Sequence, residues 1–142
     1  MKYVIVYWSH FGNGKKLVDY LAGKLKKKGA ETQIFKTDEA EPATMPEADV
    51  YVFSAPTEIH NIQKNMRKFM KNLQGMEEKK YGIINTYGMK KSRLDKMEKL
   101  LSKKKMVKVA GVEFHVEGAG VQTGNGLMNG WEAKLDEFAG KI

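Results

Sequence analysis

Cysteine is absent from the 142-residue sequence. Its absence excludes disulfides, thiolate nucleophiles, iron–sulfur ligation by the chain itself and zinc sites built on sulfur. Any redox chemistry would therefore depend on a bound cofactor. Histidine is almost as scarce, and His10, His60 and His115 stand on widely separated segments, a weak pattern for a metal site. We therefore predict that the chain has no metal ligands.

Long apolar runs are also missing. No stretch approaches the roughly 18 residues that a membrane span needs. The N-terminal sequence MKYVIVYWSH lacks the small-residue cleavage site of a signal peptide. Hydrophobic residues make up 42% of the chain and charged residues 30%, so we expect one globular domain over residues 1–142. We place it in the cytoplasm, with no membrane partner.

Arginine is rare although the chain is strongly basic. The formal net charge is +8, but of the 25 basic residues only Arg67 and Arg93 are arginine, the usual reader of bases and phosphates. The lysine clusters fall on different segments, at residues 26–28, 79–80, 90–91 and 103–105. We interpret them as a solvated surface and predict no nucleic-acid partner.

Strand-like runs alternate with amphipathic stretches along the whole chain. Runs rich in β-branched and aromatic residues predict strands at 2–8, 32–36, 49–53, 80–85 and 107–116, the last with a bulge near Gly111. Apolar residues at helical spacing predict helices over 15–28, from Asn61 onward, around 94–101 and around Trp131. This alternation favours an α/β fold with a five-stranded parallel sheet in the order 2-1-3-4-5. In that order a ligand binds at the carboxyl ends of the first and third strands.

The loop after the first strand has the composition of an anion site. Its sequence, SHFGNG over residues 9–14, combines a hydroxyl group with two glycines at the start of a predicted helix, where unpaired amides attract a phosphate. Other phosphate motifs fail on spacing. A P-loop would need glycine at Ser9 and a hydroxyl residue at Lys16, and a dinucleotide fingerprint would need glycine at Leu17.

Three segments together resemble the flavodoxin family. SHFGNG after YVIVYW looks like the flavodoxin phosphate loop, and APTEIHNIQKNMRKFM (55–70) resembles the second flavin loop with its following helix. NTYGM (85–89) is similar to the third loop, which flanks the flavin ring. The closing helix with Trp131 also stands where short-chain flavodoxins have theirs, so the resemblance covers the whole chain. It implies a flavodoxin-like three-layer sandwich that holds one FMN non-covalently.

The resemblance also implies the cofactor-binding residues, with no catalytic residue among them. Ser9, Gly12 and Asn13 would bind the FMN phosphate, joined by backbone amides of the same loop. Tyr87 would stack on the flavin ring. The full set expected to contact FMN lies in three loops: Ser9, His10, Phe11, Gly12, Asn13 and Gly14; Ala55, Pro56, Thr57, Glu58, Ile59 and His60; Thr86, Tyr87, Gly88 and Met89.

Aromatic residues outside these loops receive ordinary structural roles. Trp8 and Trp131 are assigned to the core, and His115 to the surface.

The function implied is that of a monomeric one-electron carrier between redox proteins. Because typical flavodoxins are acidic and this chain is basic, we expect its redox partners to have an acidic docking face. Two alternatives remain open. One is a small flavin-dependent reductase in which His60 or Tyr87 serves a substrate beside the ring. The other is a flavin-free interaction module whose basic surface binds an acidic partner or nucleic acid.

Overall fold

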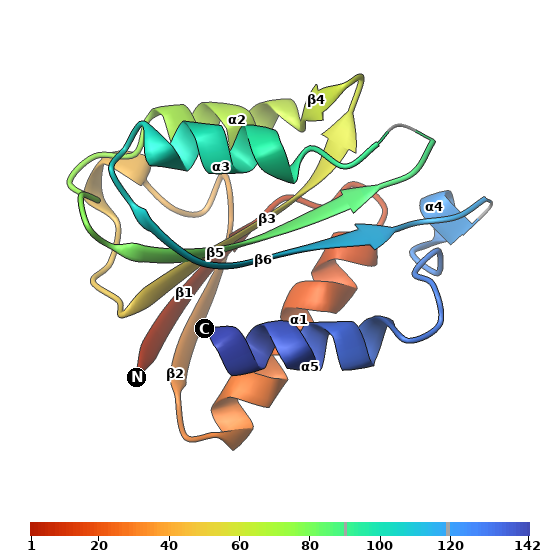
Figure 1. Cartoon of the computed structure of the whole chain (residues 1–142), viewed down its shortest axis with the longest axis horizontal. Coiled ribbons are helices and arrows are strands. Elements are labelled where there is room, and N and C mark those ends of the chain that lie inside the picture. Colours follow the sequence, from red (N-terminus) through yellow and green to blue (C-terminus); the bar gives the residue numbers. More distant parts are fainter. Residues whose placement is uncertain (90, 119) are drawn as a thin grey trace.

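A parallel sheet forms the middle layer of the structure (Figure 1), a computed structural model that describes residues 1–89, 91–118 and 120–142. Lys90, from a predicted lysine cluster, and Ala119 lie outside the described residues. The sheet contains β1 (Lys2–Tyr7), β2 (Glu31–Lys36), β3 (Val50–Glu58), β5 (Lys80–Tyr87) and β6 (Val107–His115). These strands pair in parallel in the order β2-β1-β3-β5-β6. The predicted parallel sheet and its order are confirmed.

One additional short strand was not predicted. β4 (Asn61–Ile62) pairs antiparallel with the end of β3 and closes a hairpin at the carboxyl edge of the sheet. The helix predicted from Asn61 therefore begins later, as α2 (Lys64–Lys71). Gln63 caps it, because its side-chain oxygen accepts a hydrogen bond from the backbone N–H of Met66 at 2.9 Å.

Helices cover both faces of the sheet, which gives the three predicted layers (Figure 1). α1 (Asn13–Lys27) and α5 (Trp131–Lys141) pack on one face around Leu17, Leu21 and Phe138. α2 and α3 (Leu94–Ser102) pack on the other face around Met66 and Met97. Two short helical turns complete the fold, η1 (Pro42–Thr44) and α4 (Gly120–Thr123). α4 lies in the glycine-rich segment that precedes α5.

Strand ends differ from prediction where they matter for the site. β3 and β5 continue several residues beyond the predicted ends, so Thr57 and Tyr87 belong to strands and not to free loops. The bulge in β6 lies at Val109, slightly earlier than predicted, because the register shifts between Tyr81 and Gly82 of β5. Within the described part of the chain, no helix combines the length and apolar character needed to cross a membrane.

Candidate functional site

The loop between β1 and α1 is shaped to hold an anion. Gly12 precedes α1 with φ +100°, a conformation that favours glycine, and its N–H donates to Ser9 Oγ at 3.1 Å. The first turn of α1 carries neither an acidic residue nor a side-chain cap. Among the described residues, the backbone N–H groups of Asn13, Gly14 and Lys15 have no hydrogen-bond partner. This positive helix end is therefore available to a phosphate.

Ser54 lies on the α1 side of the sheet, beside the last residue of β1, and was not among the predicted site residues. It sits on β3 next to Tyr7 of β1, and its carbonyl accepts a hydrogen bond from Trp8 N–H at 3.0 Å. Val52 faces the α1 side of the sheet and Phe53 the opposite side, so strand alternation turns Ser54 towards α1. The residue is 1% exposed, and its hydroxyl has no partner among the described residues. A buried hydroxyl without a partner is uncommon.

Asn13 has a different role from the one predicted for its side chain. Its amide Nδ2 donates to the Val121 carbonyl at 3.0 Å, and its Oδ1 accepts from Gly126 N–H at 3.0 Å. The side chain therefore holds the segment around α4 against the phosphate loop, aided by a Lys16–Asn125 hydrogen bond of 3.1 Å. Only the backbone amide of Asn13 remains available to a phosphate.

A cleft beside this loop opens between β1, β3, β5 and the α4 segment. Tyr87 and Trp8 both line it, together with Val116. Trp8 was assigned to the core, and this assignment was wrong, since the ring is only partly buried and stacks on His10 at 5.5 Å between centroids. The aromatic side chains of Trp8, Phe11 and Tyr87 therefore border the cleft, which suits a flat aromatic ligand.

The predicted site residues gather at this end of the sheet but take different positions. Ala55 is 1% exposed and packs in the core on the α2 side, so its side chain does not reach the cleft. Ile59, His60 and Met89 are exposed and do not line the cleft. Gly12 turns the phosphate loop. The predicted residues that line the cleft are Ser9, His10, Phe11, Asn13, Gly14, Pro56, Thr57, Glu58, Thr86, Tyr87 and Gly88.

Asn85 joins the second and third loops and was not predicted as a site residue. It is completely buried, and its Oδ1 accepts hydrogen bonds from Thr57 Oγ1 at 3.0 Å and Arg93 N–H at 2.9 Å. Ser92 Oγ donates to the same oxygen at 3.1 Å, while Asn85 Nδ2 donates to the Ala55 carbonyl at 2.9 Å. A single side chain therefore fixes the spacing of the two loops that border the cleft.

The tip of the β3–β4 hairpin is strained and held from outside. Ile59 and His60 both have positive φ angles, 47° and 64°, although a β-branched residue strongly disfavours this conformation. Arg93 Nη1 donates to the His60 carbonyl at 2.8 Å and so secures the turn. The guanidinium also pairs with Asp95 at 3.0 Å, and this hydrogen bond lowers the pKa of the Asp95 carboxyl from its ordinary value.

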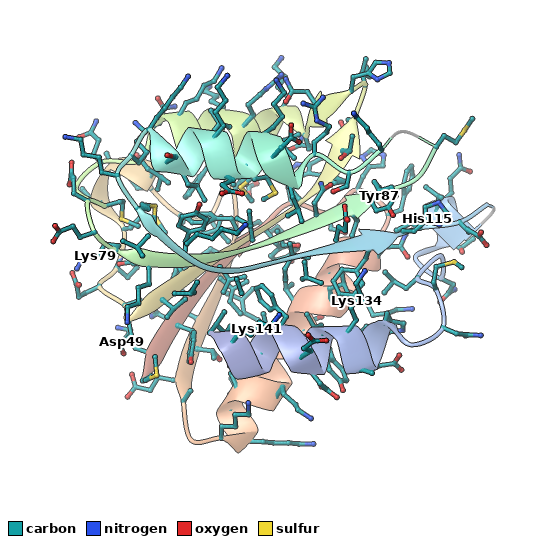
Figure 2. All side chains as sticks on the ribbon, in the orientation of Figure 1. Asp49, Lys79, Tyr87, His115, Lys134 and Lys141 are labelled. Atoms are coloured by element: carbon teal, nitrogen blue, oxygen red, sulfur yellow. The ribbon has the colours of Figure 1, made fainter. Side chains whose placement is uncertain are left out.

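The three histidines lie on different elements. His10 follows β1, His60 is in the hairpin turn, and His115 ends β6. In residues 1–89, 91–118 and 120–142, no three or more His, Asp or Glu side chains gather in a way that could hold a metal ion. Figure 2 shows His115 beside Tyr87 at the carboxyl ends of neighbouring strands, and their ring centroids are 5.2 Å apart.

Comparisons with known proteins agree with this arrangement. The flavodoxin family model matches residues 5–142. No curated protein sequence matches the chain. Among solved structures, two-electron-reduced Megasphaera elsdenii flavodoxin is similar with a TM-score of 0.75 at 17% identity, covering 99% of both chains. A Streptococcus pneumoniae flavodoxin gives a TM-score of 0.73 at 18% identity, covering 100% of both.

A larger oxidoreductase contains a similar fold. The rubredoxin oxygen:oxidoreductase of Desulfovibrio gigas gives a TM-score of 0.81 at 16% identity over 99% of this chain, but this chain spans only 35% of that protein. The structural likenesses show the fold, whereas the family model covers nearly the whole sequence, including all three predicted flavin loops. The family implies a flavin cofactor and electron transfer to redox partners. The chain belongs to the flavodoxin family.

Proposed function

We propose that the chain binds one FMN non-covalently at this site and carries single electrons between redox proteins. The observation that carries the proposal is the open start of α1, where the backbone N–H groups of Asn13, Gly14 and Lys15 have no partner among the described residues. The buried hydroxyl of Ser54, also without a partner in those residues, lies on the same side of the sheet as α1. Bound FMN would supply a ring that accepts and releases single electrons. The chain itself binds, orients and partly encloses that group.

The donor set of the β1–α1 loop fits the phosphate of FMN. Ser9 Oγ already accepts a hydrogen bond from Gly12 N–H, so its own proton is free to be donated to an anion. The free amides of α1 supply further donors, and the helix dipole favours a negative charge there. No carboxylate lies in the first turn of α1 to oppose that charge.

The cleft fits the flavin ring. Tyr87 and Trp8 offer aromatic surfaces, and Pro56 and Val116 add apolar contacts. The backbone of β3 and β5 borders the cleft, and Asn85 keeps the two strand ends at a fixed spacing. A planar ring that enters here would exchange water for aromatic and apolar contacts.

A visible absorption spectrum and two matched variants test the proposal. Purified chain should be yellow, or should take up one equivalent of FMN and quench its fluorescence. Ser54→Ala should weaken FMN binding about tenfold or more, because a hydrogen bond to a charged group contributes about 1.5–3 kcal/mol. Riboflavin, which lacks the phosphate, should bind both proteins equally.

Thr32→Val provides the control for Ser54→Ala. Thr32 Oγ1 is the other buried hydroxyl without a partner in the described residues, but it lies on β2, opposite Tyr3 near the amino end of the sheet. Its removal should leave FMN affinity unchanged. Equal losses in the two variants, or an equal loss of riboflavin in Ser54→Ala, would contradict the assignment of Ser54 to the phosphate site.

We further propose that the physiological partner has an acidic docking face. The net charge of +8 supports this, because opposite charges accelerate association and their effect fades as salt rises. Electron transfer to the partner should slow between low and moderate ionic strength. A rate that stays flat or rises with salt would refute the expectation.

A further inference from the structure

α2 carries positive charge along its whole outer side. Its sequence, KNMRKFMK, contains four cationic residues and no acidic one. Met66, Phe69 and Met70 face the core, so the cations Lys64, Arg67, Lys68 and Lys71 fall on the outward stripe. In the described part of the chain, none of these four cations has a carboxylate within ion-pair distance.

α3 carries two lysines on the side turned away from the edge strand β6. Glu98 of α3 pairs with Lys108 of β6 at 3.0 Å, so the flank that carries Glu98 faces that edge strand. Lys96 and Lys99 lie about 100° or more around the helix from Glu98, on the side away from β6. The two helices are packed together on the sheet (Figure 1), so these lysines extend the stripe of α2.

The cations of the two helices thus form one surface rich in positive charge, which we name the α2–α3 basic face. The exposed carboxylates of α3 are already paired, Asp95 with Arg93 and Glu98 with Lys108. The members of the face share an outward position and have no ion pair within the described residues: Lys64, Arg67, Lys68, Lys71, Lys96 and Lys99. In Figure 2 nitrogen-tipped side chains project from the outer side of both helices. The sequence could not indicate this grouping, because the residues come from segments 64–71 and 96–99, which only the fold brings together.

The basic face adjoins the candidate flavin site. α2 begins directly after the β3–β4 hairpin, and α3 begins directly after the loop that follows β5. At this junction two large apolar side chains are exposed, Ile59 at 87% and Met89 at 103%. Exposed apolar side chains beside charged ones are typical of protein–protein contacts.

We propose that the α2–α3 basic face, with Ile59 and Met89 at its flavin end, is the docking surface for an acidic redox protein. The cationic stripe attracts and orients the partner, and the apolar residues are covered when its redox centre meets the flavin edge. A protein fits better than a nucleic acid, because five of the six cations are lysine and a phosphodiester would leave Ile59 and Met89 uncovered. This inference rests on the proposed function, since it assigns the partner's position relative to bound FMN.

Two charge-matched variants locate the docking surface. The face variant is Lys64→Glu/Lys68→Glu/Lys71→Glu. The control variant is Lys26→Glu/Lys27→Glu/Lys28→Glu, at the far end of α1, where all three side chains are exposed. Each variant lowers the net charge by the same amount, and two of its three glutamates lie in the last turn of a helix, at positions 68 and 71 in α2 and at 26 and 27 in α1. Differences between the variants therefore report mainly where on the surface the charge was changed.

The probe is an acidic plant-type [2Fe–2S] ferredoxin, reduced beforehand, which gives one electron to the FMN-loaded chain and is itself oxidised. At low ionic strength the face variant should accept this electron about tenfold more slowly than the unmodified chain, and its rate should lose most of its salt dependence. The control variant should slow less than threefold. Affinity for FMN should be unchanged in both.

Direct binding of the oxidised ferredoxin to the flavin-free chain tests the docking surface separately from the proposal that the chain binds FMN. Loss of this binding in the face variant only would support the docking surface even if FMN did not bind. Equal effects in both variants, a larger effect in the control, or no ferredoxin binding to the unmodified chain would overturn it. It would also be overturned if the face variant lost affinity for a single-stranded oligonucleotide or anionic vesicles while ferredoxin binding stayed intact.

Discussion

Gly124→Ala should weaken the phosphate site by moving the loop that forms it. Gly124 lies in the segment held by Asn13, with φ +76°, and a Cβ built there would stand 2.8 Å from the backbone oxygen of Phe11. Ordinary contact begins near 3.4 Å, so either this segment or the phosphate loop must move by about half an ångström. Movement of that size misaligns several hydrogen bonds at once, and we expect FMN affinity to fall about tenfold, or about 1.4 kcal/mol.

The left-handed backbone at Gly124 adds a conformational strain energy to the Gly124→Ala variant, and a control variant can account for it. Alanine in this conformation costs roughly 1–2 kcal/mol of stability wherever it occurs. Gly130 has a similar φ of +87°, and a Cβ at that position would meet nothing within 4 Å, so Gly130→Ala carries the conformational cost without the collision. The FMN affinity of the Gly130→Ala variant should change less than twofold.

Fluorescence titration of both variants with FMN and riboflavin shows whether the collision at Gly124 displaces the phosphate loop. Gly124→Ala should lose affinity for FMN and keep most of its affinity for riboflavin, because only the phosphate depends on the displaced loop. If both glycine variants lose FMN equally, backbone strain and not the collision is responsible. If riboflavin binding falls as much as FMN binding, the loop does not hold the phosphate and our reasoning is refuted.

Three further outcomes follow from the structure. Asn85→Ala should lower the free energy of unfolding by about 2–4 kcal/mol, because it leaves the half-buried Thr57 hydroxyl and the buried Ala55 carbonyl without their hydrogen-bond partner. A loss below about 1 kcal/mol in denaturant titration would contradict this. Burial, with a smaller effect from Glu98, raises the pKa of Tyr81 to about 12, above its unfolded value of about 10. The contribution of the neutral Tyr81 to stability is therefore complete below pH 10 and is lost as the pH rises towards 12. Tyr81→Phe should make stability less dependent on pH in that window, and an unchanged decline would exclude Tyr81 as its cause. The lower one-electron potential of the FMN-loaded chain should be less negative than in acidic flavodoxins, by roughly 35 mV for each nearby cation. Spectroelectrochemical titration measures it, and a potential as low as that of acidic flavodoxins would refute the expectation.

The fold was predictable because its determinants are local. The apolar run of β1 is buried on both sides, as its composition indicated, and Gly29 has the positive φ expected at the end of α1. Strand alternation and crossover rules then leave few arrangements, and the observed order agrees with the simplest one. The hairpin strand β4 escaped prediction because two residues are too few to show a period, and Ile62 fits the apolar stripe of the following helix equally well.

The candidate site was predictable in place but not in detail. Loop composition indicated where a phosphate would bind, because two glycines and a hydroxyl residue at a helix start leave backbone amides open to an anion. The partners of each side chain depend on distant segments: Asn13 contacts Val121 and Gly126, more than one hundred positions away. No local pattern distinguishes an asparagine that binds a ligand from one that fastens another segment.

Asn85 shows why such residues escape sequence reasoning. An asparagine at the end of an apolar strand is usually an exposed turn residue, because its amide needs hydrogen-bond partners that a core does not offer. Here the partners come from β3 and from the start of α3, and both approach only because β5 lies between β3 and β6. The parallel sheet thus satisfies a buried amide where the flavin loops meet, and that amide in turn fixes the spacing of the cleft. Topology determines the role of the residue, so the fold has to be known before the site can be completed.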